Sequence, residues 1–269
     1  MKATLTVLGS GTSMGVPTIG CDCAVCTSRD PHDRRTRPSI MVQWDDPDGD
    51  AAASKRRTVL IDTTPDFREQ AIREHIRRID AVLYTHGHAD HILGLDDVRP
   101  LSFPRITGGT KIPLYASDST ASVLRKVFRY IFEADYKYGG LAQVEIQPLI
   151  SPVELFGAIF QPLAVIHGDV PIEGYRFGNA AYLTDFSSIP EDSLAQLQNL
   201  DILFLDALRH HPHPTHSTVE NSLKLVDQLK PQRTFFTHIS HDLPHEKTNA
   251  ALPENVRLSY DGMKLEFEL

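Results

Sequence analysis

The segment Thr85-His-Gly-His-Ala-Asp-His91 directly follows the apolar run Ile79-Asp-Ala-Val-Leu-Tyr84. The run predicts a buried strand, because it is short, apolar and bounded by glycine and polar residues. Side chains that follow a strand end can point to two sides of a small space. His86 and His88 can therefore face one ion while Asp90 and His91 face another. Imidazole and carboxylate without cysteine favour zinc, manganese or iron. The segment therefore predicts a metal centre rather than a histidine-rich polar loop, with ligands His86, His88, Asp90 and His91.

Three more apolar, strand-like runs end on a side chain of the metal-binding type. Residues 159–166 lead to His167, residues 180–184 to Asp185, and residues 233–237 to His238. Sheets in α/β proteins place their sites at the carboxyl ends of strands. A single residue of this kind is more simply a turn residue, but four strand ends of one type indicate a common site.

The cysteines form a second motif. All three of them lie in Cys21-x-Cys23-x-x-Cys26. An odd, clustered set without a secretory signal indicates a metal site in a reducing compartment rather than a disulfide framework. Structural zinc takes four ligands and accepts three cysteines with one histidine. We therefore expect a zinc knot near residues 20–38, with three unrelated thiols as the alternative.

Length and composition favour one compact enzyme. We expect a single domain over residues 1–269, since 41% hydrophobic residues support a sizeable core. A net charge of −8 argues against a broad nucleic-acid-binding surface. No apolar stretch is long enough to span a membrane, and the first residues enter a strand pattern rather than a signal peptide, which predicts a cytoplasmic protein. The sequence is compatible with a homodimer as well as with a monomer.

The order of elements predicts an α/β protein. Strands are expected near 3–8, 39–44, 58–62, 80–84, 143–184 and 200–205, and helices over 65–78, 119–132, 190–198 and 217–230. The polar segment 45–57 predicts a protruding hairpin loop. This alternation indicates a four-layer αβ/βα sandwich, in which two sheets face each other and helices cover the outside.

Two further residues have competing interpretations. Asp62, at the end of a strand, accepts a hydrogen bond from a ligating imidazole, caps the helix over 65–78, or does both; Thr63 and Thr64 compete for the capping role. His216 precedes Ser217-Thr-Val-Glu220, a capping-box pattern that starts a helix. A helix amino terminus lowers the pKa of an imidazole, so this histidine can stay neutral and donate a hydrogen bond. The neighbouring histidines are expected at the surface or rim: His210, His211 and His213.

The pattern His-x-His-x-Asp-His, followed by a distant histidine, an aspartate and a last histidine, resembles the metallo-β-lactamase-fold hydrolases over nearly the whole chain. Residues 20–26 and Thr237-His-Ile-Ser-His241 resemble, more narrowly, the cyclic-phosphate phosphodiesterase of the carbon–phosphorus lyase system. The resemblance implies His241 as the fourth zinc ligand. It implies His86, His88 and His167 at one active-site ion, Asp90, His91 and His238 at the other, and Asp185 as the bridge.

The expected function is that of a dinuclear hydrolase with two zinc or manganese ions and one structural zinc. We expect a phosphodiesterase for small, cyclic or nucleotide substrates, in which Asp185 and His216 are catalytic. The alternatives are an oxidative iron enzyme like one of quinone-cofactor biosynthesis, a tRNA 3′-processing endonuclease and a non-catalytic binding module. Arg29–Arg37 either receives a substrate phosphate or is a solvated turn. Tyr136, Tyr138 and Gly139-Gly140 are candidates for a lid or for a wall on which a base stacks.

Overall fold

The computed structural model describes residues 1–46, 55–133, 140–150 and 152–269, which form two seven-stranded sheets. The first sheet has the order β14-β1-β2-β3-β4-β5-β6 and comprises β14 (Lys264–Glu268), β1 (Lys2–Gly9), β2 (Ser39–Asp45), β3 (Arg56–Ile61), β4 (Ala81–Leu83), β5 (Ile112–Ala116) and β6 (Val144–Pro148). The second has the order β13-β12-β11-β10-β9-β8-β7 and comprises β13 (Val256–Leu258), β12 (Arg233–Thr237), β11 (Ile202–Asp206), β10 (Ala180–Leu183), β9 (Val170–Phe177), β8 (Ala158–His167) and β7 (Val153–Leu155).

Each sheet is antiparallel in one half and parallel in the other. Strands β14, β1, β2 and β3 pair antiparallel, and β3 to β6 pair parallel. In the second sheet β7 to β10 pair antiparallel, and β10 to β13 pair parallel. The carboxyl ends of β3, β4, β8, β10, β11 and β12 therefore point to one edge of the molecule.

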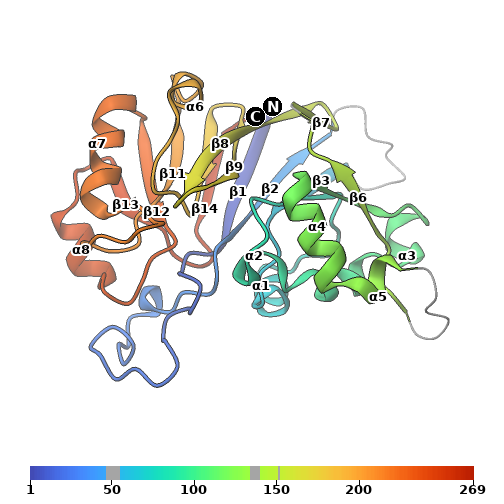
Figure 1. Cartoon of the computed structure of the whole chain (residues 1–269), viewed down its shortest axis with the longest axis horizontal. Coiled ribbons are helices and arrows are strands. Elements are labelled where there is room, and N and C mark those ends of the chain that lie inside the picture. The colour runs from blue at the N-terminus through green and yellow to red at the C-terminus, as the bar shows by residue number, and fades with distance from the viewer. Residues whose placement is uncertain (47–54, 134–139, 151) are drawn as a thin grey trace.

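Three apolar cores define four layers. Side chains from the inner faces of both sheets, including Trp44, Phe160 and Tyr182, pack against each other between the sheets. A second core fills the space between the first sheet and its helices, and a third does the same on the other side. Figure 1 shows helices α1 to α5 beside one sheet and α6 to α8 beside the other. The predicted four-layer αβ/βα sandwich is confirmed.

The helices are shorter than the sequence pattern predicts. They are α1 (Phe67–Arg73), α2 (Ala89–Ile92), α3 (Pro104–Thr107), α4 (Asp118–Val127), α5 (Arg129–Phe132), α6 (Glu191–Ala195), α7 (Val219–Leu229), α8 (His245–Ala251) and the 3₁₀ helices η1 (Pro31–Asp33) and η2 (Leu95–Leu101). The predicted helix over 65–78 stops at α1 because the chain turns at His75, whose φ is 53°. The predicted helix over 119–132 breaks at Phe128 into α4 and α5.

The start of α7 differs from the predicted capping box by one residue. The N-cap is Thr218, whose side chain accepts a hydrogen bond from the backbone N–H of Asn221. The Glu220 carboxylate lies 2.6 Å from His210 Nδ1. Most of the predicted loop over 45–57 lies outside the described residues.

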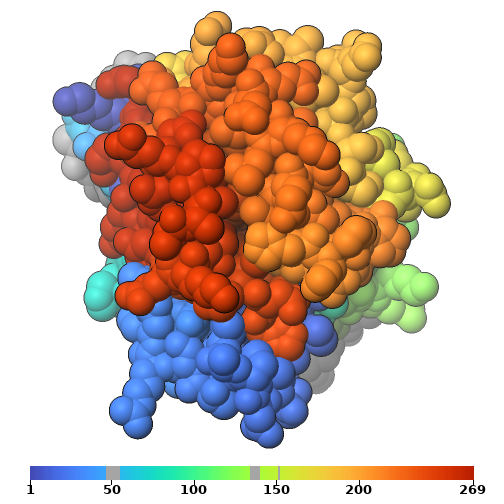
Figure 2. Space-filling model, turned by 90° about the vertical axis from the view of Figure 1, so that its left-hand side faces the viewer, coloured from blue at the N-terminus to red at the C-terminus, as the bar shows by residue number. Residues whose placement is uncertain are grey.

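Residues 10–38 connect β1 to β2 and pack against the C-terminal part of the chain. In Figure 2 this blue segment lies directly below the red segment. The side chain of Arg35 is fully buried there; it donates hydrogen bonds to the carbonyls of Ser240 and Leu243 and pairs with Asp33. No helix in the described residues is both long enough and apolar enough to cross a membrane.

Removing the Phe160 side chain should destabilise the inter-sheet core. Its ring lies 6.1 Å from that of Trp44, the single tryptophan, so fluorescence during urea unfolding reports on this core. Phe160→Ala should lower the free energy of unfolding by about 3–5 kcal/mol. The matched control is Ile159→Ala, the neighbouring residue that is 55% exposed, which should cost no more than about 0.5 kcal/mol. Equal losses in both variants would contradict the packing described.

Candidate metal centre

Six strand ends converge at the edge where the two sheets meet. Asp62 follows β3, His86 follows β4 after a short link, His167 ends β8, Asp185 follows β10, and His238 follows β12; Asp206 ends β11. Three of these residues have left-handed backbone conformations, with φ of 67° at Asp62, 58° at Asp185 and 56° at His238. Residues other than glycine adopt this region at a cost, and such strain gathers at functional sites. The turn redirects the chain immediately after the strand.

The first cluster of potential ligands consists of three histidines. One ligand-type atom from each of His86, His88 and His167 lies within 4.8 Å of the others. His86 Nε2 is 3.0 Å from His88 Nδ1, and the rings of His88 and His167 are 5.1 Å apart. His88 is exposed, whereas the other two are buried. The cluster is therefore accessible from the side of His88.

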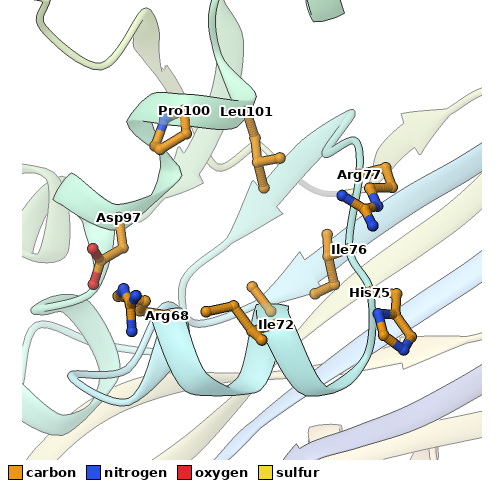
Figure 3. A pocket seen from close by; sticks show the side chains of 9 residues that line it. Arg68, Ile72, His75, Ile76, Arg77, Asp97, Pro100 and Leu101 are labelled. Carbon is orange, nitrogen blue, oxygen red and sulfur yellow. The ribbon is translucent and has the colours of Figure 1, made fainter.

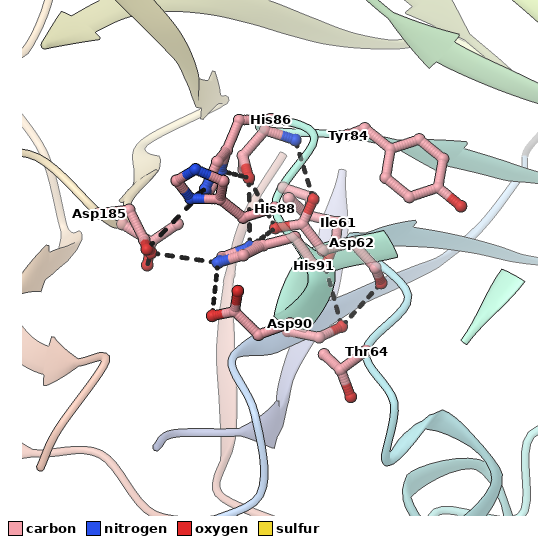
Figure 4. Close-up of polar contacts among 12 residues, drawn as sticks. Ile61, Asp62, Thr64, Tyr84, His86, His88, Asp90, His91 and Asp185 are labelled. Atoms are coloured by element: carbon pink, nitrogen blue, oxygen red, sulfur yellow. Dashed lines mark hydrogen bonds and ion pairs between the residues drawn. The ribbon is translucent and has the colours of Figure 1, made fainter. Parts of the chain in front are cut away.

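The second cluster is fully buried and contains both carboxylates. His91 Nε2 lies 3.3 Å from an oxygen of Asp90 and 3.3 Å from one of Asp185. His238 Nε2 lies 3.5 Å from Asp90 and 3.1 Å from Asp185. The Asp185 carboxylate also approaches His86 Nε2 of the first cluster, at 4.0 Å. Asp185 thus lies between the two clusters (Figure 4).

The donor atoms fit divalent metal ions. Asp90 Oδ2, His91 Nε2 and His238 Nε2 are buried and have no hydrogen-bond partner among the described residues. Buried polar atoms normally have a partner, and in a set of nitrogen and oxygen donors a metal ion can be that partner. The other ring nitrogen is held by the protein in three imidazoles: His86 by Thr85 at 3.0 Å, His91 by Asp62 at 2.7 Å, and His167 by the Asp185 carbonyl at 2.6 Å. Ligating histidines are typically oriented in this way.

The electrostatics of the second cluster also favour a cation. Burial alone would lower the pKa of His91, but the carboxylates of Asp185, Asp90 and Asp62 outweigh it and raise that pKa well above its ordinary value. For His238, Asp185 and its other acidic neighbours likewise outweigh burial and raise the pKa to about 9. The site therefore attracts positive charge, whether as protons on imidazole or as metal ions.

Asp62 contacts His91 and does not cap a helix. Its carboxylate accepts hydrogen bonds from the backbone N–H and the hydroxyl of Thr85, both at 2.8 Å, and it is fully buried. The N-cap of α1 is Asp66, so neither Thr63 nor Thr64 occupies that position. Of the two interpretations of Asp62, the structure agrees with the imidazole partner.

His216 lies at the rim of both clusters and is paired with a carboxylate that the sequence analysis missed. Its Nδ1 is 2.8 Å from Asp206 Oδ2, and its ring is 4.9 Å from that of His167 and 4.6 Å from that of His238. Burial and, next to it, the nearby His238 lower the pKa of His216 to about 4, so the ring is neutral at pH 7. Asp206 ends an apolar strand as Asp62 does, and this pattern could have identified it.

The three cysteines converge on one nitrogen. His241 Nδ1 lies 3.2 Å from Cys21 Sγ, 3.5 Å from Cys23 Sγ and 3.4 Å from Cys26 Sγ. One imidazole nitrogen cannot form three hydrogen bonds at once. A tetrahedral zinc with ordinary bond lengths places sulfur and nitrogen ligands about 3.5 Å apart. The backbone N–H of Cys26 lowers the pKa of Cys23 to about 6, which favours the thiolate. These four residues thus fit a structural zinc.

The remaining candidate residues are not all at the site. His213 lies at the rim, its ring 5.0 Å from that of His216, whereas His210 and His211 are exposed. In the Arg29–Arg37 segment, Arg35 is buried in the structural contacts described above and Arg37 pairs with Asp66 at 3.0 Å, so neither is a solvated turn residue nor free for substrate. Arg29 and Arg34 are exposed. Tyr136 and Tyr138 lie outside the described residues, and Gly140 is exposed.

A cavity of about 370 Å³ lies elsewhere, between α1 and η2 (Figure 3). Ile72, Ile76 and Leu101 form its apolar part, and Arg68 and Arg77 line it as well. It contains none of the residues of the two clusters. Its size alone therefore does not make it the candidate site.

Comparison with known proteins places these motifs in a family. The model of the beta-lactamase superfamily domain matches residues 57–239. The chain is 66% identical to a protein whose crystal structure is described as a new diphosphatase from the PhnP family; the match covers 100% of this chain and 98% of that one, with a TM-score of 0.92. Zn²⁺-bound PqqB from Methylobacterium extorquens shares the fold, with a TM-score of 0.72, 23% identity and coverage of 97% and 99%.

A longer relative is also similar. An octanoyltransferase of Porphyromonas gingivalis is 37% identical over 263 residues, which is 96% of this chain. The chain spans 50% of the length of that relative.

Loss of one cysteine should remove one zinc ion and loosen its loop. Cys23→Ser should lower the zinc content by one ion per chain, as measured by mass spectrometry of metals, because a structural site closes with four ligands. Since the chain has its own core, the melting temperature should fall without unfolding, and amide exchange should speed up over residues 20–38. The control is Ser28→Ala in the same loop, which should retain the ion. Unchanged zinc and melting in Cys23→Ser would refute the site.

Proposed function

Because the chain belongs to the metallo-β-lactamase superfamily, and within it to the PhnP family, we propose that it is a metal-dependent phosphodiesterase for small substrates. The observation that carries the proposal is the pair of ligand clusters that share Asp185 at one sheet edge. Phosphoryl transfer develops charge on oxygen atoms, and two closely spaced cations match that charge.

We assign one divalent ion, zinc or manganese, to the first cluster and a second ion to the second cluster, with Asp185 shared. When bound, the two ions would polarise the phosphoryl oxygens and make water a stronger nucleophile at neutral pH. The chain's own residues hold the ligands in place. Asp62 and Thr85 orient His91 and His86, and exposed His88 lies on the side from which substrate enters.

His216 acts on the departing oxygen in this proposal. The contact of Nδ1 with Asp206 leaves Nε2 free at the rim of the clusters, where the neutral ring can accept the proton that the attacking water loses and then pass it to the departing oxygen. Asp206 fixes the angle of the ring and stabilises the positive charge that the ring bears when both nitrogens are protonated. Transfer of a proton to a poor leaving group contributes roughly 10²–10⁴-fold to a rate.

The activity of the 66% identical relative supports a second candidate bond. A diphosphatase cleaves a phosphoanhydride, which presents the same phosphoryl oxygens to the site. A panel of cyclic nucleotides, ribosyl cyclic phosphates, bis-p-nitrophenyl phosphate and diesters of diphosphate would rank the two bonds by kcat/KM. A preference for the diphosphate diesters would identify the phosphoanhydride as the bond that the enzyme cleaves.

The alternatives receive less support. PqqB shares the fold at 23% identity, and the complete ligand set with Asp90 and His167 is what a dinuclear hydrolase needs. Iron content and oxygen uptake would reveal an oxidative enzyme. The net charge of −8 opposes a tRNA-processing nuclease, because nucleic-acid affinity depends on basic side chains. The name of the octanoyltransferase belongs to a protein of twice the length.

Asp185→Asn should abolish activity without unfolding the protein. Asparagine tolerates the left-handed backbone at this position, so the turn survives, but the charge shared between the clusters is lost. Hydrolysis of bis-p-nitrophenyl phosphate should fall by more than about 10²-fold, exceeding the loss expected for an outer hydrogen-bond partner. One zinc ion should remain in the cysteine site. The control, Asp192→Asn on the exposed face of α6, should retain full activity. Loss of the cysteine-bound ion in Asp185→Asn would show that the sites are not independent.

Replacing His216 should impair substrates with poor leaving groups most. His216→Ala should lower kcat on an alkyl ester by roughly 10²–10³-fold and hurt bis-p-nitrophenyl phosphate much less, because p-nitrophenolate leaves without a proton. Asp206→Asn should show the same dependence to a smaller degree. His211→Ala is the control, since His213 contacts the ring of His216 and His211 is exposed. Equal losses of kcat on both substrates, or loss of a metal ion, would show that His216 is a metal ligand or a structural residue and not a proton donor.

A further inference from the structure

A cavity of about 210 Å³ lies beside the first cluster. His86, His88 and His167 form one of its walls. The other walls come from α4, through Thr120 and Val123, and from the start of β9, through Val170, Pro171 and Ile172. The cavity is therefore continuous with the candidate metal centre, unlike the larger one between α1 and η2.

Apart from the histidines and the hydroxyls of α4 and its N-cap, the described residues that line this cavity are apolar or glycine, and they include no lysine, arginine, aspartate or glutamate. Val170, the first residue of β9, is 57% exposed, whereas Ile172, two residues further along the strand, is 5% exposed. The hydroxyls on the α4 side contact one another: Ser117 Oγ lies 3.2 Å from Ser119 Oγ and donates to Thr120 Oγ1 at 3.1 Å. They provide a polar edge opposite the apolar residues of β9. No lysine or arginine among the described lining residues could pair with a second phosphate, so the cavity suits a neutral group better than a charged one.

We infer that this cavity binds an uncharged ring of the substrate, attached through the ester that stays on phosphorus. The inference rests on the proposed phosphodiesterase function. His216, which faces the departing oxygen in that proposal, does not line the cavity, so the group bound here is the other ester substituent. An apolar cavity of about 150 Å³ accommodates benzene, so this one suits a single ring such as an aryl group, a pyrimidine or a pentose. The substrate class is a phosphodiester with one neutral cyclic substituent.

Binding of two non-hydrolysable probes tests the inference apart from activity. Calorimetric titration of the zinc-loaded protein should show phenylphosphonate binding about 10- to 100-fold more tightly than methylphosphonate, as expected for burial of one ring. Val170→Glu puts a charge at the mouth of the cavity and should remove this preference. Ile159→Glu alters a residue of similar exposure that does not line the cavity, and should keep the preference.

A second variant covers the opposite wall. Ser119→Asp lies in the first turn of α4, where an acidic residue is favourable for the helix, so it tests the cavity even if Val170→Glu fails to fold. Ser122→Asp is its matched control, because it makes the same change at an exposed position of the same helix that does not line the cavity. Loss of the phenyl preference in Ser119→Asp but not in Ser122→Asp supports the cavity. No phenyl preference in the unaltered protein, or a preference that survives the lining variants, overturns the inference.

Hydrolysis separates this inference from the function on which it rests. Methyl and phenyl p-nitrophenyl phosphate share a leaving group and differ only in the retained ester, and kcat/KM should favour the phenyl substrate. If neither is hydrolysed, the phosphodiesterase proposal fails, and the calorimetric preference still decides whether the cavity binds a ring. If both are hydrolysed at equal rates and the probes bind equally, the function stands and the cavity assignment falls.

Discussion

Burial of negative charge at the edge between the two sheets is the constraint on which this structure depends. Asp185 and Asp90 are buried where little water can reach them, and an isolated carboxylate in such a place is strongly unfavourable. The imidazoles of His91 and His238 surround this charge with donors that can carry a proton or hold a metal ion. The strand directions, the sharp turns after the strands and the hydrogen bonds to the second ring nitrogens all place these donors. The rigidity of the site therefore depends on the packing of the two sheets, because each sheet carries part of the ligand set.

Much of the fold and of the candidate site could be predicted from the sequence, because both follow from short-range rules. Apolar runs of strand length ended on His167, Asp185 and His238, and strands that run in one direction bring their ends to one edge. The residues whose roles the sequence does not predict have roles that depend on tertiary contacts. Asp206 and Thr85 are recognised only once the imidazoles they contact have been placed.

Other differences have equally local causes. Arg35 gives no signal in the sequence that it will be buried among backbone carbonyls, since arginine is rarely fully buried without partners. The early end of α1 follows from the turn at His75, and the division of α4 from α5 follows from a non-helical Phe128. Periodicity predicts that a helix exists more reliably than it predicts where the helix ends.

The left-handed turns at Asp62, Asp185 and His238 limit how this protein can change over evolution. Glycine adopts such a backbone freely, asparagine, aspartate and histidine adopt it more often than other residues do, and a β-branched residue is an outlier there. A descendant that no longer bound metal ions would still need one of these few residues at each turn to keep the sheet edge intact. Aspartate at the first two positions and histidine at the third satisfy both this backbone requirement and a buried role. If metal binding were lost, changes at Asp185 or His238 would therefore be expected to favour asparagine or glycine over apolar residues.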